Sequence, residues 1–283
     1  MKASMHDDGR IRAVLLDWAG TAIDHGSRAP ALVFIEVFAA VGIELTESEA
    51  RGPMGLAKRD HIAAILALPR IRESWLQAHG REPSAADVDG IYGRFLPLQK
   101  AVLADHCEPI PGVLDAIDFC RRHGIAIGST TGYTRELMDI VVPTAARSGF
   151  APDVVVCSDD VPAGRPAPWM NLRAAELLGI RPSAAVVVID DTAPGAAAGR
   201  NARMTTLGVT LTGNGLGLSV AQVGSIPADE LVLRAASVRT TLLEAGADEC
   251  LGGVADLPAW LEQRDFRCRP AGLLRRPPTE KRA

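Results

Sequence analysis

The side chains best suited to chemistry in this sequence stand directly after short apolar runs. The run 14–16 leads into Asp17, and a turn of small residues that contains Gly20 follows. A buried strand that ends in a carboxylate delivers it to the edge where open α/β sheets bind ligands. Asp17 is therefore a candidate nucleophile, a candidate metal ligand, or both. The alternative is an aspartate that only caps the turn after the strand.

Hydroxyl groups and small residues follow a second apolar run, 125–129. Ser129, Thr130, Thr131 and Gly132 stand just before a helix that the pattern predicts over 134–148. Free backbone N–H groups and the helix dipole would make this stretch a cradle for an anion. Thr134 is also predicted to cap the helix, and both roles are compatible.

A cation and two further acids complete the set. Arg165 lies between a glycine and a proline on a predicted loop, from which it could pair with a phosphoryl group. A lone arginine in a loop is more often a surface residue. The apolar run 185–189 ends in Asp190 and Asp191. Two acids at the end of a buried strand suggest a metal ligand, and Mg²⁺ fits best because few carboxylates hold it.

One lysine stands in an unusual position. A helix that starts after Gly55 would place Lys58 within the angular span of an apolar stripe that includes Ile62, with His61 at its flank. A lysine on an apolar face either extends its amine to the surface or loses its charge. A neutral lysine amine beside a site is a Schiff-base nucleophile. Periodicity alone leaves both interpretations open.

The elements that must position these residues form an α/β pattern. Strands are predicted at 13–17, 125–129, 154–157, 185–190 and 205–209, with helical stretches between the later ones. This alternation predicts a Rossmann-like parallel sheet with helices on both faces. Residues 29–104 show no strand pattern, and Pro30 is expected to open a helix over 31–41. We therefore expect a discontinuous core domain (1–26 and 105–265), an inserted α-helical cap domain (27–104) and a disordered tail (266–283).

Composition narrows the function class. The chain has 283 residues and a net charge of −4, and only 4% of its residues are aromatic, which argues against a nucleic-acid partner despite the basic tail. No run reaches the roughly 18 apolar residues of a membrane span. Five cysteines without a CxxC pair indicate a reducing, cytoplasmic location. The glycine-rich stretch 213–218 lacks a GxGxxG pattern, so a dinucleotide site is not expected.

The ordered set of acid, hydroxyl, cation and acid resembles the haloacid dehalogenase superfamily. Four motifs of that superfamily match Asp17 (nucleophile), Ser129 and Thr131 (second motif), Arg165 (third) and Asp191 (metal-binding fourth). Phosphatases of the superfamily usually carry an acid two residues after the nucleophile, and Ala19 stands there. The usual proton donor for an ester leaving group is therefore missing.

Four longer stretches resemble the phosphonoacetaldehyde hydrolase (phosphonatase) family: DWAGTAIDHGSRAP, PMGLAKRDH, GSTTGYTRELMDIV and DDVPAGRPAPWM. The resemblance extends from about residue 11 to 262. It implies that Lys58 forms a Schiff base and that Asp17 is the nucleophile. The implied magnesium ligands are Asp17, the Ala19 carbonyl and Asp191. The implied substrate-binding residues are Met54, Gly55, Ser129, Thr131, Gly132, Tyr133 and Arg165, with His61 in the same site. Gly195 replaces a second acid found in many superfamily members, so Asp190 is a candidate substitute.

The expected function is hydrolysis of the P–C bond of phosphonoacetaldehyde to acetaldehyde and phosphate. Lys58 would form an imine, Asp17 an aspartyl-phosphate, and His61 would transfer protons around the imine, with Mg²⁺ as cofactor. Activation of the leaving group by the lysine would explain Ala19. We also expect a homodimer. The apolar helix over 31–41 could form its contact, and packing of this helix in the core is the alternative. The alternatives are a phosphatase or phosphomutase acting on a phosphate ester and a non-catalytic phosphonate-binding protein.

Overall fold

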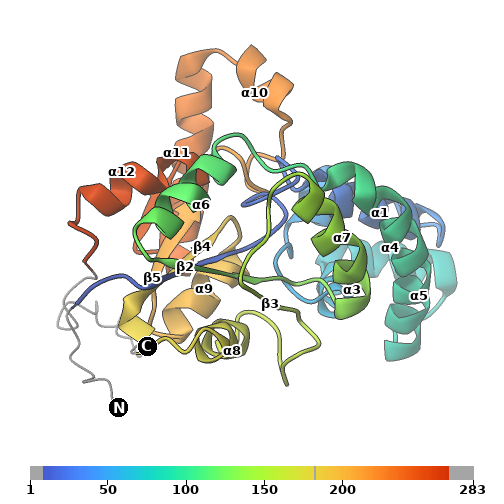
Figure 1. Ribbon diagram of the computed structural model, residues 1–283. Coiled ribbons are helices and arrows are strands. Elements are labelled where there is room, and N and C mark those ends of the chain that lie inside the picture. The colour runs from blue at the N-terminus through green and yellow to red at the C-terminus, as the bar shows by residue number, and fades with distance from the viewer. Residues whose placement is uncertain (1–8, 182, 268–283) are drawn as a thin grey trace, which may run out of the picture.

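A parallel sheet forms the centre of the computed structural model, which describes residues 9–181 and 183–267 (Figure 1). Within this part of the chain the sheet has six strands in the order β3-β2-β1-β4-β5-β6. Their bounds are β1 Ala13–Leu16, β2 Ala126–Thr130, β3 Val154–Val156, β4 Val186–Asp190, β5 Thr205–Val209 and β6 Glu249–Leu251. All neighbouring strands run parallel, which confirms the predicted α/β class.

The central strand β1 explains why the sheet brings the candidate residues together. Its four residues are fully buried, as expected for a strand that helices cover on both faces. Leu16 pairs with Ser129 of β2 on one side and with Ile189 of β4 on the other. The chain therefore leaves all three strands at neighbouring points of the carboxyl edge. The connection that leaves β1 leads to β2 on one side, and the connection that leaves β4 leads to β5 on the other. Such sheets bind ligands at the point where neighbouring connections depart in opposite directions.

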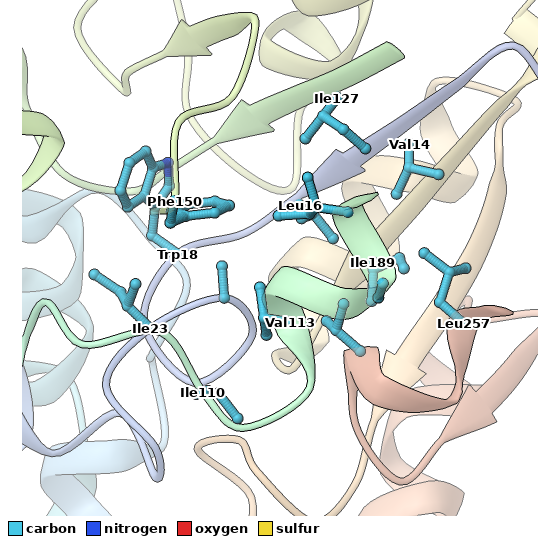
Figure 2. Packing of buried hydrophobic residues seen from close by; sticks show 14 of the residues in the cluster. Val14, Leu16, Trp18, Ile23, Ile110, Val113, Ile127, Phe150, Ile189 and Leu257 are labelled. Carbon is cyan, nitrogen blue, oxygen red and sulfur yellow. The ribbon is translucent and has the colours of Figure 1, made fainter. Parts of the chain in front are cut away.

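Alternate side chains of β1 enter two hydrophobic clusters on opposite faces of the sheet. Val14 and Leu16 pack in one cluster with α6 (Val113–Arg122), α7 (Arg135–Arg147) and α12 (Leu257–Glu262), part of which is drawn in Figure 2. Ala13 and Leu15 pack in the other cluster with α8 (Trp169–Leu177). Helix α9 (Ala193–Asn201) contacts β4, β5 and α8. Helices thus pack on both faces of the sheet and hold the strands whose carboxyl ends carry the candidate residues.

A second group of helices follows β1 directly and lies at one end of the sheet (Figure 1). We call residues 27–104 the cap segment. Its helices are α1 (Arg28–Ala39), α2 (Glu47–Arg51), α3 (Lys58–Leu66), α4 (Pro69–His79) and α5 (Ala85–Leu103). They enclose a hydrophobic cluster of their own that includes Phe34, Ile62, Trp75 and Phe95.

The two ends of the cap segment connect to the core side by side. The backbone N–H of Ile110 donates to the carbonyl of Ala22 at 2.9 Å, and Ile23 forms an antiparallel bridge with Pro109. His106 Nδ1 lies 3.0 Å from Asp24 Oδ1. The chain therefore enters and leaves the cap segment through one pair of adjacent linkers.

The first cap helix begins earlier than the pattern predicts. The sequence favours a helix over 31–41, but α1 spans Arg28–Ala39. The buried Asp24 carboxylate accepts a hydrogen bond from the backbone N–H of Ala29 at 3.0 Å, so it satisfies one of the free donors of the first turn. Pro30 consequently lies inside the first turn instead of before it.

The C-terminal part corrects the predicted number of strands from five to six. Residues Glu249–Leu251 form the additional strand β6, which pairs with β5. The C-terminal part also contains α10 (Val220–Ser225), α11 (Ala228–Ala245), which contacts β6, and a 3-10 turn at Val254–Asp256. Two further 3-10 turns, Ala104–His106 and Ser183–Ala185, lie earlier in the chain. The predicted tail lies outside the described residues from residue 268 onward. Phe266 is tied to the core because its carbonyl accepts from Ile11 N–H at 2.8 Å.

Among residues 9–181 and 183–267, no helix is both long enough and apolar enough to cross a bilayer.

Candidate active site

Asp17 and Arg165 form a buried ion pair at the carboxyl edge of the sheet. One guanidinium nitrogen of Arg165 lies 2.7 Å from Asp17 Oδ1 and 3.1 Å from Asp190 Oδ2. The same nitrogen donates to the carbonyl and the hydroxyl of Thr130, at 3.1 and 2.9 Å. These contacts hold the guanidinium of Arg165 beside the carboxylate of Asp17, as phosphoryl binding requires.

Three carboxyl groups meet at this point. Asp17, Asp190 and Asp191 are buried, and oxygen atoms of the three lie within 4.8 Å of one another. Burial raises the pKa of Asp17 to about 6, although Arg165 lowers it. Burial and the charge of Asp17 raise the pKa of Asp191 well above its usual range. The protein's own groups therefore leave negative charge uncompensated, and a divalent cation with oxygen ligands fits this donor set.

Asp191 is held by groups from two loops. Thr21 donates its hydroxyl hydrogen to Asp191 Oδ1 at 3.0 Å, and the backbone N–H of Asn214 donates to Oδ2 at 2.6 Å. A Cβ at Gly20 would approach the Asp191 carboxyl carbon to 2.9 Å, so a side chain has no room there. The carboxylate of Asp191 is thus fixed on both oxygens.

Asp190 is oriented by the start of the next helix. Its Oδ1 accepts from the backbone N–H and the hydroxyl of Thr192 at 2.9 and 2.7 Å. Its Oδ2 lies beside Arg165. Gly195 packs directly against the Asp190 carboxyl group, in the volume where a side chain at position 195 would begin. The structure therefore places Asp190 in the site, beside the position where the sequence lacks the second acid.

Lys58 lies in the first turn of α3, and only 4% of it is exposed. Its Nζ lies 4.8 Å from the ring centroid of Tyr133 and 5.6 Å from that of Phe34. Burial lowers the pKa of Lys58 to about 8, while the charge of Asp17 partly opposes that change. A larger fraction of this amine is neutral near neutral pH than for an exposed lysine, which favours attack on a carbonyl.

His61 lies one turn further along α3 and is completely buried. Its Nε2 is 2.9 Å from the carbonyl of Ala50, and its ring stacks on Phe34 with centroids 3.8 Å apart. Because a carbonyl only accepts, Nε2 carries the proton, and Nδ1 keeps a lone pair without a partner among the described residues. Burial and the charge of Lys58 lower the pKa of His61 well below its usual value.

The segment before Lys58 rests directly on the core loops. Gly55 has φ +96° and a Cβ there would meet the Thr192 side chain, with 2.9 Å to its Cβ. A Cβ at Gly132 would lie 2.8 Å from the carbonyl oxygen of Leu56. Met54 is buried in the same segment, with 4% exposed. Small residues on both sides thus allow the two backbones to approach closely.

The hydroxyl side chains at the end of β2 and just after it have different roles from those predicted. Ser129 Oγ donates to the Val154 carbonyl at 3.1 Å, so this hydroxyl is engaged within the sheet. Thr131 Oγ1 accepts from the backbone N–H of Tyr133 at 3.1 Å. Thr130, predicted only as part of the anion cradle, instead holds Arg165. Successive residues of a strand point their side chains to opposite faces of the sheet, so the sequence could have predicted different roles for Ser129 and Thr130. Ala19 is half-buried next to Asp17.

Comparison with known proteins follows this geometry. The model of the haloacid dehalogenase-like hydrolase family matches residues 11–203. A phosphonoacetaldehyde hydrolase of Syntrophobacter fumaroxidans is 46% identical over 255 residues, which cover 90% of this chain and 92% of that protein. A phosphonoacetaldehyde hydrolase of Bacillus cytotoxicus is 42% identical over 260 residues, or 91% of this chain and 98% of that protein.

Among solved structures, a phosphonoacetaldehyde hydrolase like protein of Oleispira antarctica has the same fold. The TM-score is 0.89 at 35% sequence identity, over 94% of this chain and 97% of the other. The chain therefore belongs to the haloacid dehalogenase-like hydrolases and, within them, to the same family as these phosphonoacetaldehyde hydrolases. The resemblance predicted from the sequence is confirmed at both levels.

Proposed function

We propose that this protein hydrolyses the P–C bond of phosphonoacetaldehyde to acetaldehyde and phosphate. The observation that carries the proposal is the buried Lys58 amine, whose charge interacts with Asp17 and whose pKa is lowered to about 8. Kinship with phosphonoacetaldehyde hydrolases of 42–46% identity supports the same substrate. Because a carbanion is a poor leaving group, cleavage of a P–C bond needs an electron sink, and an imine on Lys58 supplies one.

The imine half of the reaction uses the cap segment. The neutral amine of Lys58 adds to the aldehyde carbon, and loss of water gives a protonated imine. The electron pair of the breaking P–C bond moves onto this imine, so the carbon fragment leaves as an enamine. Protonation and hydrolysis of the enamine release acetaldehyde and regenerate Lys58. The free lone pair on His61 Nδ1 supports a role for His61 in accepting and returning these protons.

The phosphoryl half uses the core. Asp17 attacks phosphorus in line with the departing carbon and forms an aspartyl-phosphate, which water then hydrolyses to phosphate. Arg165, held 2.7 Å from Asp17, offsets negative charge on the phosphoryl oxygens. The backbone N–H of Gly132 is a further candidate donor, whereas that of Thr131 already donates to the Val156 carbonyl at 3.1 Å. A magnesium ion held by Asp17, Asp191 and the Ala19 carbonyl would add positive charge at the same oxygens.

The absence of an acid at position 19 agrees with a mechanism in which Lys58 activates the leaving group and Asp17 accepts the phosphoryl group. An ester phosphatase must protonate an alkoxide, whereas here the imine stabilises the leaving carbon. Lys58 is part of α3 and Asp17 follows β1, so we also propose that residues 27–104 act as a cap domain that closes over the core. Closure would exclude water from the imine.

We also propose that the protein is cytoplasmic and forms a homodimer. Cys107, Cys120, Cys157 and Cys250 are free thiols, which supports a reducing cytoplasm. Cys268 lies outside the described residues. Most large apolar residues of α1 pack inside the cap segment, while Leu32 is 55% exposed. The homodimer remains a proposal, and the mass in solution would test it.

The decisive experiment measures phosphate release from phosphonoacetaldehyde by the purified protein, with and without EDTA. We expect EDTA-sensitive release by the wild type, and none by Asp17→Ala. A panel of phosphate monoesters serves as the matched substrate control. Rapid turnover of an ester with no activity on the phosphonate would favour the phosphatase or phosphomutase alternative. Tight binding of phosphonoacetaldehyde without turnover would favour a binding protein.

A further inference from the structure

The glycine-rich loop 213–217 has no role in the reaction described so far, yet it lies directly on the Asp191 side chain. Asn214 N–H donates to Asp191 Oδ2 at 2.6 Å. A Cβ at Gly213 would lie 2.9 Å from the same oxygen, so only glycine lets the loop approach this closely. The position of the loop and the position of the Asp191 carboxylate are therefore coupled.

Arg51, the last residue of α2 in the cap segment, forms hydrogen bonds with the same loop. One guanidinium nitrogen of Arg51 donates to Asn214 Oδ1 at 3.1 Å, and the other donates to the Gly217 carbonyl at 3.1 Å. In return, Asn214 Nδ2 donates to the Arg51 carbonyl at 3.2 Å. Since a guanidinium only donates and a carbonyl only accepts, both contacts require the same orientation of the Asn214 amide. The side chain of Arg51 is 12% exposed.

Arg51 also reaches the linker through which the chain enters the cap segment. Its guanidinium donates to the carbonyl of Gly26 at 2.8 Å and to that of Ser27 at 3.3 Å. A Cβ at Gly217 would come within 2.6 Å of the Arg51 guanidinium, so the loop is shaped to receive this side chain. Arg51 thus joins three pieces of chain: the cap segment, its entry linker and the loop on Asp191.

The segment that begins at Arg51 leads to the reactive amine. Only residues 52–57 lie between Arg51 and Lys58, and this stretch contains Gly55, which packs on Thr192. Fixing Arg51 against the core therefore fixes one end of the short connection that carries Lys58. Gly55 packs on the Thr192 side chain and Leu56 on Gly132, so these two residues of the connection contact the core by packing.

We propose that Arg51 and Asn214 form a latch that holds the cap segment closed on the core and ties the position of Lys58 to that of Asp191. Both are positioning residues, because neither touches the reacting atoms. The latch explains two of the glycines in this loop, because Gly213 packs on Asp191 and Gly217 on Arg51. Its kinetic consequence rests on the proposed function, whereas its structural consequence does not.

The test combines Arg51→Ala, Asn214→Ala and the double variant, with Arg72→Ala as the matched control. Arg72 is a cap-segment arginine in an exposed ion pair with Glu82, and its loss should change kcat/KM by less than twofold. We expect Arg51→Ala to lower kcat/KM for phosphonoacetaldehyde roughly 10-fold or more, since it removes several hydrogen bonds to a charged group. The double variant should be little worse than Arg51→Ala alone, because both substitutions open the same latch.

Hydrogen–deuterium exchange supplies a readout independent of activity. Exchange over residues 52–57 should rise in both single variants, with exchange over the sheet unchanged. If Arg51→Ala proves unstable by its Tm, Arg51→Lys takes its place, since a lysine cannot bridge several carbonyls and should show an intermediate loss. Additive kinetic effects, or unchanged exchange over 52–57, would overturn the latch. A wild type that releases no phosphate would overturn the proposed function alone, and the exchange experiment would still decide on the latch.

Discussion

The carboxyl group of Asp190 packs against Gly195 and fills the space where any side chain at position 195 would begin. Gly195 lies in the first turn of α9, which starts just after Asp190 and Asp191. The carboxyl group of Asp190 can therefore take this position only because residue 195 has no side chain. A residue larger than glycine at 195 would have to displace Asp190 from Arg165.

We predict that Gly195→Ala destabilises the protein by about 1–3 kcal/mol, because it overpacks a filled space. The free energy of unfolding in urea measures the effect. Gly90→Ala is the matched control: it is also a helical glycine, but its Cβ would meet nothing, so it should stabilise by about 0.5–1 kcal/mol. Adding Asp190→Gly to Gly195→Ala should recover part of the loss. No recovery would mean that Asp190 is not the obstacle.

Lys58 should give the imine reaction a characteristic dependence on pH. Burial lowers its pKa to about 8, so the protonated form dominates below this value and cannot attack an aldehyde. We expect the rate of borohydride inactivation in the presence of phosphonoacetaldehyde to rise about tenfold per pH unit up to pH 8 and then to level off. A rate that keeps rising to pH 10 would show that the reacting amine is not buried.

The site of trapping can be mapped with little ambiguity. The sequence contains only four lysines, Lys2, Lys58, Lys100 and Lys281. The reduced adduct should lie on Lys58, and Lys58→Arg should abolish both the adduct and phosphate release. Lys100→Arg is the control, since Lys100 is partly exposed and paired with Glu136. Full activity in Lys58→Arg would rule out the imine.

Magnesium should stabilise the protein in a pH-dependent manner. The raised pKa values of Asp17 and Asp191 mean that the folded protein binds more protons than the unfolded chain above pH 4. Without a cation, this acid cluster therefore loses stability as the pH rises through about 6. A bound divalent cation replaces those protons, so added Mg²⁺ should raise Tm by several degrees at pH 7.5 and much less at pH 5.

Two aspartate variants serve as controls for this thermal shift. Asp191→Asn should lose most of the rise in Tm, while Asp139→Asn, an exposed aspartate on α7, should retain it. An equal shift at both pH values, or in both variants, would place magnesium elsewhere on the protein.

Gly55 offers a test of how closely the cap segment must approach the core. Gly55→Ala adds a Cβ that meets Thr192 at a residue with φ +96°. We expect kcat/KM to fall roughly 100-fold, since a displacement of about 1 Å can have that effect. Gly80→Ala has the same unfavourable left-handed backbone, with φ +69°, but open space around it. It should cost about 1–2 kcal/mol of stability and leave kcat/KM unchanged.

Part of this site was predictable because it depends on local patterns. An apolar run that ends in an acid predicts a strand and the place of its last carboxylate, and Asp17, Asp190 and Asp191 lie where those patterns put them. The same holds for Lys58, which the helical period placed on the apolar face of α3 and which is buried. Five of the six strands and the run of cap helices follow from the same periodicities.

The remaining contacts join loops that are far apart in the sequence. Arg51 and Asn214 are separated by 163 positions, and neither stands in a periodic pattern. A guanidinium at a helix end can reach any of the many carbonyls of the fold, so its residue type does not specify a partner. The early start of α1 has a similar cause, because the cap comes from Asp24, five residues before Ala29 and outside the helical pattern.

The paired linkers of the cap segment have a consequence for how such enzymes diversify. Because Ile23 and Pro109 are bridged, the two ends of the inserted cap segment meet at almost one point of the host fold. The sheet would close in the same way around a short turn, and the insertion carries its own hydrophobic cluster. The insertion is therefore exchangeable in principle: a different helical module grafted at this junction would assign a new leaving group to an unchanged phosphoryl-transfer core.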